Sequence, residues 1–369
     1  MAEVQLKSVS KRFGKHPLLQ NLSLDIQSGE YIGLLGPSGC GKTTLLKIIA
    51  GLVAADSGDV LLAGKRVNEI APRKRDVSLV FQNDALYPHL TVNESIRMSL
   101  GGLPAAEQRA RINEACQITH ASDLLDRRPD NLSGGELRRA AITKAVARRA
   151  SVRLLDEPLS ALDAHIRHSI QSALLQWHTA TPGTTIHVTH DGQEAARVAD
   201  RIAVIDQSQD GLCNVIQFDR PEVIYRRPQS KSVAMLVGSP PMTLLPAKLH
   251  NSALVFGSDR IRPTASIELL ESVETEIEVG FRSDAIQHVD SRFDQNVAGL
   301  FLSGRFGRTQ FVNGKTLTTI DLGNAELLLD VPVGSSPANG ASDCEVFIAS
   351  SELHFFGAAS GLRLSSHSG

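Results

Sequence analysis

The sequence has no long apolar run, no excess charge of one sign and no leader pattern, and each absence excludes a class of protein. No stretch reaches the roughly 18 uninterrupted apolar residues of a membrane-spanning helix, and the most apolar one, residues 233–249, is broken by three prolines. A formal net charge of −2 gives no bulk attraction to nucleic acid, so no nucleic-acid partner is expected. The N-terminus lacks the basic start and apolar centre of a signal peptide.

Cysteine is also scarce. The four cysteines, Cys40, Cys116, Cys213 and Cys344, are scattered and show no paired spacing typical of a metal site. A reducing cytoplasm is therefore the simplest fit. The 369 residues exceed what one core usually supports, and 42% hydrophobic and 21% charged residues are typical of a folded protein. We expect two domains.

The most informative stretch is a glycine-rich loop between an apolar strand, residues 31–35, and an apolar helical pattern that begins at Leu45. Backbone N–H groups of such a loop surround an anion, and the helix N-terminus adds positive potential. Lys42 is expected to reach the β- and γ-phosphates of a nucleotide, and the Thr43 hydroxyl to hold Mg²⁺. The predicted nucleotide-binding residues are Gly36, Pro37, Ser38, Gly39, Cys40, Gly41, Lys42, Thr43 and Thr44.

Acidic and amide side chains follow two other apolar runs. Asp156 and Glu157 end one of them, where acids are costly unless they meet metal or water. Asp156 suits a role near Mg²⁺, and Glu157 suits a base beside the attacking water. Gln82 ends the run 77–81, where a buried amide needs a partner such as the metal or its water. Arg153, inside its strand, is expected to face an edge or an ion-pair partner.

Other features have two interpretations when taken alone. Ser133 precedes two glycines and caps a helix, which predicts either an anion-binding end or an ordinary cap. His190 follows a strand and is either structural or catalytic. Phe13, between strands predicted at 3–7 and 22–26, either stacks on a purine base or packs within its loop, and the residue alone favours packing.

The pattern along the chain divides it into parts. Residues 91–150 are predicted to be helical, with breaks at Pro104 and Pro129. The segment 238–241 is the expected linker, and Asn313-Gly314 predicts a hairpin. A small barrel or sandwich is expected after the linker, from short strands at 252–256, 276–281, 297–302, 309–312, 316–320, 326–330 and 344–349.

Read in order, the phosphate loop, Gln82, the segment 132–136, Asp156-Glu157 and His190 resemble the ABC-transporter ATPases. In that family these are Walker A, the Q-loop, the signature, Walker B and the H-loop. The resemblance implies that Glu157, His190 and Gln82 are catalytic, that Phe13 stacks on adenine, and that Thr43, Gln82 and Asp156 bind the metal. It also implies a signature of Leu132, Ser133, Gly134, Gly135 and Glu136, and a D-loop of Ser160, Ala161, Leu162 and Asp163.

A finer resemblance, to the maltose and glycerol-phosphate type of importer ATPases, is carried by residues 84–92, 237–242 and 280–282. It implies an α/β P-loop NTPase fold with a RecA-type core, antiparallel β and helical subdomains, and a C-terminal all-β OB-like regulatory domain. The implied nucleotide-binding domain is 1–237, with its helical subdomain at about 88–150, and the OB-like β-barrel is 238–369.

The function implied by this resemblance is ATP hydrolysis, with Mg²⁺, that drives uptake of a sugar or sugar-phosphate. The implied assembly is a head-to-tail homodimer in which the signature of one subunit closes over ATP held by the other. The implied partners are integral membrane permease subunits and, indirectly, an extracytoplasmic solute-binding protein. The implied location is peripheral, on the cytoplasmic face of the inner membrane.

Two residues depart from the family pattern. Glu136 stands where Gln is usual and adds negative charge near a phosphate, and Lys144 stands where Arg is more usual. Because Ser133, Gly134 and Gly135 are intact, an active enzyme is expected.

Other functions stay open. A polyamine or inorganic-anion importer, or a binding module gated by ATP, has similar motifs. ABC ATPases of translation and DNA repair carry a second such domain or long coiled-coil insertions, which this chain lacks, and a P-loop kinase has no use for the signature.

Overall fold

A computed structural model describes residues 2–81, 86–160, 162–208, 210–250, 253–264, 274–289, 297–312, 315–323, 326–331 and 343–364. The chain folds into two compact units, unit 1 (Met1–Arg226) and unit 2 (Arg227–Gly369). Parts of the sequence predictions lie outside the described residues: Gln82, residues 84 and 85 of the segment 84–92, Ala161, the first residue of the run 252–256, Asn313 and Gly314.

Unit 1 is built on one mixed sheet, in the order β5-β4-β1-β2-β10-β9-β3-β8-β7-β6. The two strands predicted at 3–7 and 22–26 are present and longer than expected, because they pair with each other as an antiparallel hairpin. The strands are β1 (Val4–Phe13), β2 (His16–Ile26), β3 (Tyr31–Leu35), β4 (Ser57–Leu62), β5 (Lys65–Arg66), β6 (Val77–Val80), β7 (Val152–Asp156), β8 (Thr184–Thr189), β9 (Arg201–Gln207) and β10 (Cys213–Asp219).

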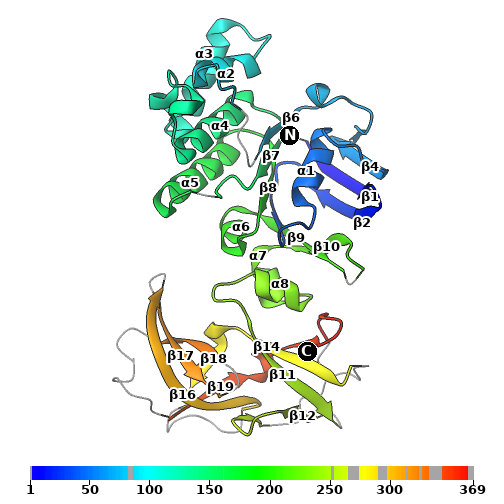
Figure 1. Ribbon diagram of the computed structural model, residues 1–369, viewed down its shortest axis with the longest axis vertical. Coiled ribbons are helices and arrows are strands. Elements are labelled where there is room, and N and C mark those ends of the chain that lie inside the picture. Colours follow the sequence, from blue (N-terminus) through cyan, green and yellow to red (C-terminus); the bar gives the residue numbers. More distant parts are fainter. Residues whose placement is uncertain are drawn as a thin grey trace. The chain divides into compact units, whose positions relative to one another are not determined.

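The helices of unit 1 cover this sheet, and α2 to α5 gather on the side of β6 and β7 (Figure 1). Pro104 and Pro129 break the helical region as predicted, since Pro104 precedes α3 and Pro129 begins a short 3₁₀ turn before α4. The helices are α1 (Lys42–Ala50), α2 (Val92–Ser99), α3 (Ala105–Thr119), α4 (Gly134–Arg148), α5 (Ala164–Ala180), α6 (Gly192–Val198) and α7 (Pro221–Arg226).

The parallel part of the sheet determines where the site lies. Strands β3, β8, β7 and β6 are neighbours and run in the same direction, with Leu35 beside Thr189 and Asp156 beside Val188. Their carboxyl ends therefore meet at one edge, which is where open α/β sheets bind ligands. The phosphate loop, Asp156-Glu157 and His190 all follow these ends.

Two apolar clusters support this edge. One packs α1 between the antiparallel and parallel strands through residues such as Leu45, Ile49 and Leu154. The other joins the helices of residues 92–148 to α5, with Trp177 and Leu155 fully buried in it. Each loop at the sheet edge is thus held at its base by a packed core.

The expectation for Arg153 is wrong. Strand β7 lies between β6 and β8, so Arg153 is not at an edge, and its side chain is fully buried. Its Nη2 donates hydrogen bonds to the Thr181 carbonyl oxygen (2.8 Å) and hydroxyl (2.7 Å), and the guanidinium lies 4.4 Å from the Trp177 ring centroid. Burial lowers its pKa to about 10. Arg153 thus ties the end of α5 to the strand that carries Asp156.

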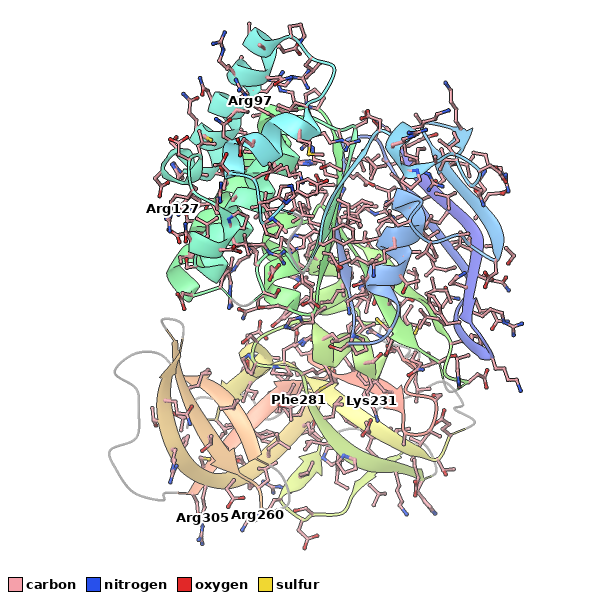
Figure 2. The ribbon with its side chains drawn as sticks, turned by 45° about the horizontal axis from the view of Figure 1, so that its top comes forward. Arg97, Arg127, Lys231, Arg260, Phe281 and Arg305 are labelled. Carbon is pink, nitrogen blue, oxygen red and sulfur yellow. The ribbon has the colours of Figure 1, made fainter. Side chains whose placement is uncertain are left out.

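Unit 2 is all β apart from α8 (Lys231–Leu236) and short 3₁₀ turns in its described residues. Its two sheets run β12-β11-β14-β20 and β15-β19-β16-β17-β18, and β13 pairs with β16. Phe281, labelled in Figure 2, belongs to the core between them. The strands are β11 (Thr243–His250), β12 (Ala253–Phe256), β13 (Ile261–Pro263), β14 (Glu276–Phe281), β15 (Ile286–His288), β16 (Gly299–Val312), β17 (Lys315–Asp321), β18 (Glu326–Val331), β19 (Asp343–Ala349) and β20 (His354–Gly357).

The division between the units lies at Arg226/Arg227, eleven residues before the domain boundary predicted at residue 238. The reason is α8, which packs on the β strands of unit 2. Its Ala234 is buried with Met242 and Phe356, and the Ala234 carbonyl accepts a hydrogen bond from Arg282 Nη1 at 2.9 Å.

Among the residues that the structure describes, no helix is long and apolar enough to cross a bilayer. All four cysteines are free and buried.

Candidate functional site

The phosphate loop adopts the strand–turn–helix arrangement that its sequence predicts. It connects β3 to α1, and the first residue before the helix, Gly41, has φ of 86°, a left-handed conformation that glycine adopts without strain. Gly36 is required for a different reason, because a Cβ there would lie 2.1 Å from the carbonyl oxygen of Ile205. The loop is thus shaped by positions where a side chain is strained or does not fit.

Lys42 is buried within this loop, with its side chain directed at the loop backbone. Its ammonium group donates hydrogen bonds to the carbonyl oxygens of Gly36 (2.8 Å) and Pro37 (2.7 Å). The Cys40 thiol lies 3.8 Å from the same nitrogen, and burial raises the pKa of that thiol. The loop therefore holds a cation, next to the N-terminus of α1 and its free N–H groups.

Thr43 and Asp156 come together from different elements. The Thr43 hydroxyl, on the first turn of α1, donates a hydrogen bond of 2.9 Å to Asp156 Oδ1 at the end of β7. Asp156 is 3% exposed, and burial raises the pKa of its carboxyl group. These are two of the three residues predicted to bind a metal; the third, Gln82, lies outside the described residues.

Glu157 has an unusual backbone. Its φ is 46°, a left-handed conformation that costs a non-glycine residue about 1–3 kcal/mol. Hydrogen bonds hold the residue there: its N–H donates to the Val188 carbonyl at 3.0 Å, and its carbonyl accepts from the Ser160 hydroxyl at 2.8 Å. This turn directs the Glu157 carboxylate toward His190, whose Nδ1 lies 3.5 Å from Glu157 Oε1.

One pocket of about 380 Å³ is lined by residues of the phosphate loop, including Lys42 and Thr43, and by Glu157 and His190. A carboxylate and an imidazole thus face a cation and a helix N-terminus across a space large enough for phosphate groups. Leu18 of β2, which the sequence predictions did not include, also lines the pocket.

The predicted signature lies elsewhere in unit 1. Ser133 caps α4, and the described residues that line the phosphate-loop pocket include none of 132–136. Gly135 lies close to the D-loop, since a Cβ there would be 3.5 Å from Leu162 Cδ2. Within one chain, therefore, the structure brings the signature to the D-loop and not to the phosphate loop.

Phe13 ends β1 and is 52% exposed, with Lys11 Nζ 5.4 Å from its ring centroid. It is not among the residues that line the phosphate-loop pocket. The side chain of Phe13 is therefore accessible to a ligand.

In the D-loop, Leu162 is buried and Asp163 is the residue before α5.

Arg138 is a residue that the sequence analysis missed. It is 4% exposed on α4 and donates hydrogen bonds to the carbonyl oxygens of Pro158 (2.9 Å), Asp156 (3.3 Å), Glu157 and Phe81. One guanidinium thus joins the helix that follows the signature to the Walker B turn and to the end of β6. A signal was present, because Arg138 lies on the same helical stripe as the buried Ala141, Ile142 and Ala145.

Comparison with known proteins identifies the family. A family model described as ABC transporter matches residues 19–160. The sn-glycerol-3-phosphate import ATP-binding protein UgpC 2 of Agrobacterium fabrum is 42% identical over 275 residues, which cover 73% of this chain and 72% of that protein. The chain belongs to the ABC transporter family. It is an ATPase of the ABC type, as the motif order predicted.

One relative of this ABC ATPase matches nearly the whole chain, and another matches about two thirds of it. The sulfoquinovosyl glycerol transport ATP-binding protein SmoE of Agrobacterium fabrum is 35% identical over 365 residues, 97% of this chain and 98% of that protein. The maltose/maltodextrin import ATP-binding protein MalK of Yersinia pestis is 43% identical over 251 residues, 68% of this chain and 67% of that protein. The predicted resemblance to this subgroup is confirmed.

Solved structures confirm the P-loop fold. A dimeric post-hydrolysis state of an ATP-binding cassette bound to ADP and Pi matches with a TM-score of 0.53 and 29% identity, over 59% of this chain and 98% of that one. A dimeric bacterial ABC transporter cassette gives the same values.

Proposed function

We propose that this ABC ATPase drives the import of a sugar or sugar-phosphate through separate membrane permease subunits. The observation that carries the catalytic part is the pocket in which Lys42 and the α1 N-terminus face Glu157 and His190. The proposal on solute class is supported by relatives named for glycerol 3-phosphate, sulfoquinovosyl glycerol and maltose import.

In the proposed mechanism, the phosphates of ATP take the N–H groups of the phosphate loop, and the Lys42 ammonium turns from two carbonyls to a phosphate oxygen. Glu157 accepts a proton from water as the water oxygen attacks the γ-phosphorus, and the bond from that phosphorus to the β–γ bridging oxygen breaks, so that ADP leaves. His190, 3.5 Å from Glu157, donates to the γ-phosphate. Phe13 stacks on the base. The strained turn at Glu157 keeps its carboxylate beside the pocket while its backbone is held by hydrogen bonds.

The site also fits Mg²⁺. Hydroxyl and carboxylate oxygens are ligands that Mg²⁺ prefers, and those of Thr43 and Asp156 lie 2.9 Å apart, so both can face one ion or its water. Gln82 is the third proposed ligand. When bound, Mg²⁺ offsets negative charge on the phosphates.

The assembly that we propose is a head-to-tail homodimer. Within one chain the signature does not line the phosphate-loop pocket, so in this proposal a second copy supplies Ser133, Gly134 and Gly135 to the bound phosphate, and the D-loop lies at the junction. The solved cassettes that resemble unit 1 are dimeric, which supports this arrangement. Permease subunits and a solute-binding protein complete the importer, with this subunit peripheral on the cytoplasmic face of the membrane.

Steady-state phosphate release from ATP tests the catalytic proposal. Glu157→Gln is expected to lower kcat by about 100-fold or more, the usual contribution of a general base, while ATP affinity stays the same. Glu114→Gln, which changes an exposed carboxylate paired with Arg149, is the matched control and keeps wild-type turnover. Turnover unchanged in Glu157→Gln contradicts the assigned base.

Uptake by cells that carry this subunit with its own permease subunits tests the solute class. Labelled glycerol 3-phosphate, a maltodextrin and sulfoquinovosyl glycerol are compared with labelled spermidine and sulfate. The proposal expects ATPase-dependent uptake of one of the first three. Uptake of only spermidine or sulfate contradicts it.

A further inference from the structure

The N-terminus of α4 already holds an anion that belongs to the same chain. The backbone N–H of Ser133 donates a hydrogen bond of 2.8 Å to Glu136 Oε2, and the Ser133 hydroxyl donates to the same oxygen at 2.9 Å. The Glu136 N–H donates in return to the Ser133 hydroxyl, at 3.4 Å. Both hydrogen-bond donors of Ser133 are therefore engaged by a carboxylate.

A cation holds the other oxygen of that carboxylate. Arg127 Nη1 donates to Glu136 Oε1 at 2.8 Å, and Arg127 lies at the outer edge of the helical part of unit 1 (Figure 2). The backbone N–H of Ser133, its hydroxyl and Arg127 together lower the pKa of Glu136 to about 2. Glu136 is therefore fully ionised at neutral pH.

A second helix of unit 1, α2, begins with the same kind of cap but is not part of the signature. Thr91 caps α2, and its N–H and hydroxyl donate to Glu94 Oε2 at 2.8 and 3.1 Å. Such a capping box is an ordinary way to begin a helix. What distinguishes Glu136 is that its carboxylate sits on the groups that the proposed function assigns to a partner's phosphate.

We propose that Glu136 competes with the ATP of the opposing subunit for the N-terminus of α4, and that the Arg127–Glu136 pair sets how readily the dimer closes. This inference rests on the proposed function, in which Ser133 contacts a phosphate held by another copy. One hydroxyl proton cannot serve two anions, so the carboxylate must leave Ser133 before a phosphate takes its place. Arg127 pairs with the displaced carboxylate and screens its charge from the phosphate.

Glu136→Gln distinguishes the effect of the negative charge from the effect of the helix cap. A Gln side chain also completes a capping box, but it carries no charge to repel a phosphate. Glu136→Gln is therefore expected to favour closure, which is the opposite of what loss of a needed contact produces. The effect follows the charge at the helix end, not the stability of the helix.

The experiment uses the full chain carrying Glu157→Gln, so that bound ATP is not consumed. Sedimentation velocity gives the ATP concentration at which half of the protein is dimeric. Adding Glu136→Gln is expected to lower that concentration by about 2- to 5-fold, the range for one charge near a helix terminus. Because the pKa of Glu136 is about 2, the same shift is expected at pH 6, 7 and 8.

Two control variants separate the contact from general effects. Glu94→Gln removes a carboxylate from the equivalent cap of α2, and it is expected to leave the half-dimer ATP concentration unchanged. Arg127→Gln removes the partner of Glu136, so it is expected to raise that concentration when Glu136 is present and to change it much less beside Glu136→Gln. This second variant also tests the contact if Glu136→Gln impairs folding.

The outcomes distinguish this inference from the proposed function. If Glu157→Gln alone stays monomeric at every ATP concentration, the head-to-tail dimer fails and the inference fails with it. If Glu157→Gln dimerises but Glu136→Gln leaves the required ATP unchanged or raises it, Glu136 is no competitor and the proposed function stands. An equal shift with Glu94→Gln contradicts the inference as well.

Discussion

At the scale of single residues, Glu157 combines backbone strain with a position that lines the phosphate-loop pocket. Its φ of 46° is retained because its N–H and carbonyl are both hydrogen-bonded, to Val188 and Ser160 among others. Strain of this kind persists only where surrounding structure fixes it. Here the result is a carboxylate that lines the phosphate-loop pocket, 3.5 Å from His190 Nδ1.

Lys42→Ala tests the phosphate loop at this scale. A charge-assisted hydrogen bond contributes about 1.5–3 kcal/mol, so ATP affinity is expected to fall at least about tenfold. Titration calorimetry measures the change. Lys47→Ala, which removes the same charge from the last turn of α1, is the control and keeps the wild-type affinity. Equal affinities for Lys42→Ala and wild type rule out the assigned role of Lys42.

The residues that could be predicted from the sequence are those whose chemistry depends on a local pattern. The phosphate loop needs only a strand, a glycine-rich turn and a helix, all contiguous in the chain. Arg138 and Arg153 were not predicted, because their partners are carbonyl groups far away in sequence. For example, Arg153 reaches Thr181 across 28 residues.

At the scale of elements, α4 is the connection between the signature and the Walker B turn. Its Arg138 donates to carbonyls of Phe81, Asp156, Glu157 and Pro158, so a rotation of α4 moves or releases all of them. Arg138 contacts no substrate in this account and is a positioning residue. In the proposed mechanism, Arg138 couples the helix that contacts the partner's ATP to the carboxylate of Glu157, which acts on the ATP bound by its own chain.

Arg138→Gln is therefore expected to lower kcat by on the order of 10- to 100-fold, because Glu157 loses its fixed position, with little change in the KM for ATP. Arg139→Gln is the matched control, since in the described structure the Arg139 side chain donates only to the His120 carbonyl and not to the Walker B turn. Thermal unfolding checks that both variants fold. A raised KM with unchanged kcat contradicts the positioning role.

Strands were predicted less completely than the phosphate loop. The runs 297–302 and 309–312 belong to one strand, β16, whose first half pairs with β19 and second half with β17. Between the two predicted runs, Gly304 allows close packing, since a Cβ there would lie 2.5 Å from Ile320 Cγ2. Sequence period alone does not distinguish a turn from such an approach.

At the scale of the whole molecule, the boundary between the two units follows side-chain packing and lies at Arg226/Arg227. The Pro-rich segment 238–241 was the best linker signal in the sequence, but α8 comes before it and packs within unit 2. Composition shows where a chain is irregular, and it does not show which core a short helix joins. The match to the solved cassette includes 98% of that cassette and 59% of this chain. The second figure is about the share of this chain that unit 1 makes up.

Truncation tests this division. A chain that ends at Arg226 is expected to be monodisperse and to bind ATP, because it keeps every described contact of unit 1. A chain that ends at Met242 carries α8 with its normally buried Ala234, but lacks Phe356 and Arg282, which contact Ala234 in the full chain. It is expected to aggregate more on size-exclusion chromatography with light scattering. The reverse order of behaviour contradicts the boundary at Arg226.

The central claim is that two copies of this ABC ATPase close on ATP, each supplying a signature to the other. Sedimentation velocity of the full-length Glu157→Gln variant, with and without ATP, tests it most directly. The account predicts a monomer without nucleotide and a dimer with ATP, and loss of that dimer when Ser133→Arg blocks the end of α4. A monomer in saturating ATP, or a dimer that Ser133→Arg leaves intact, would contradict it.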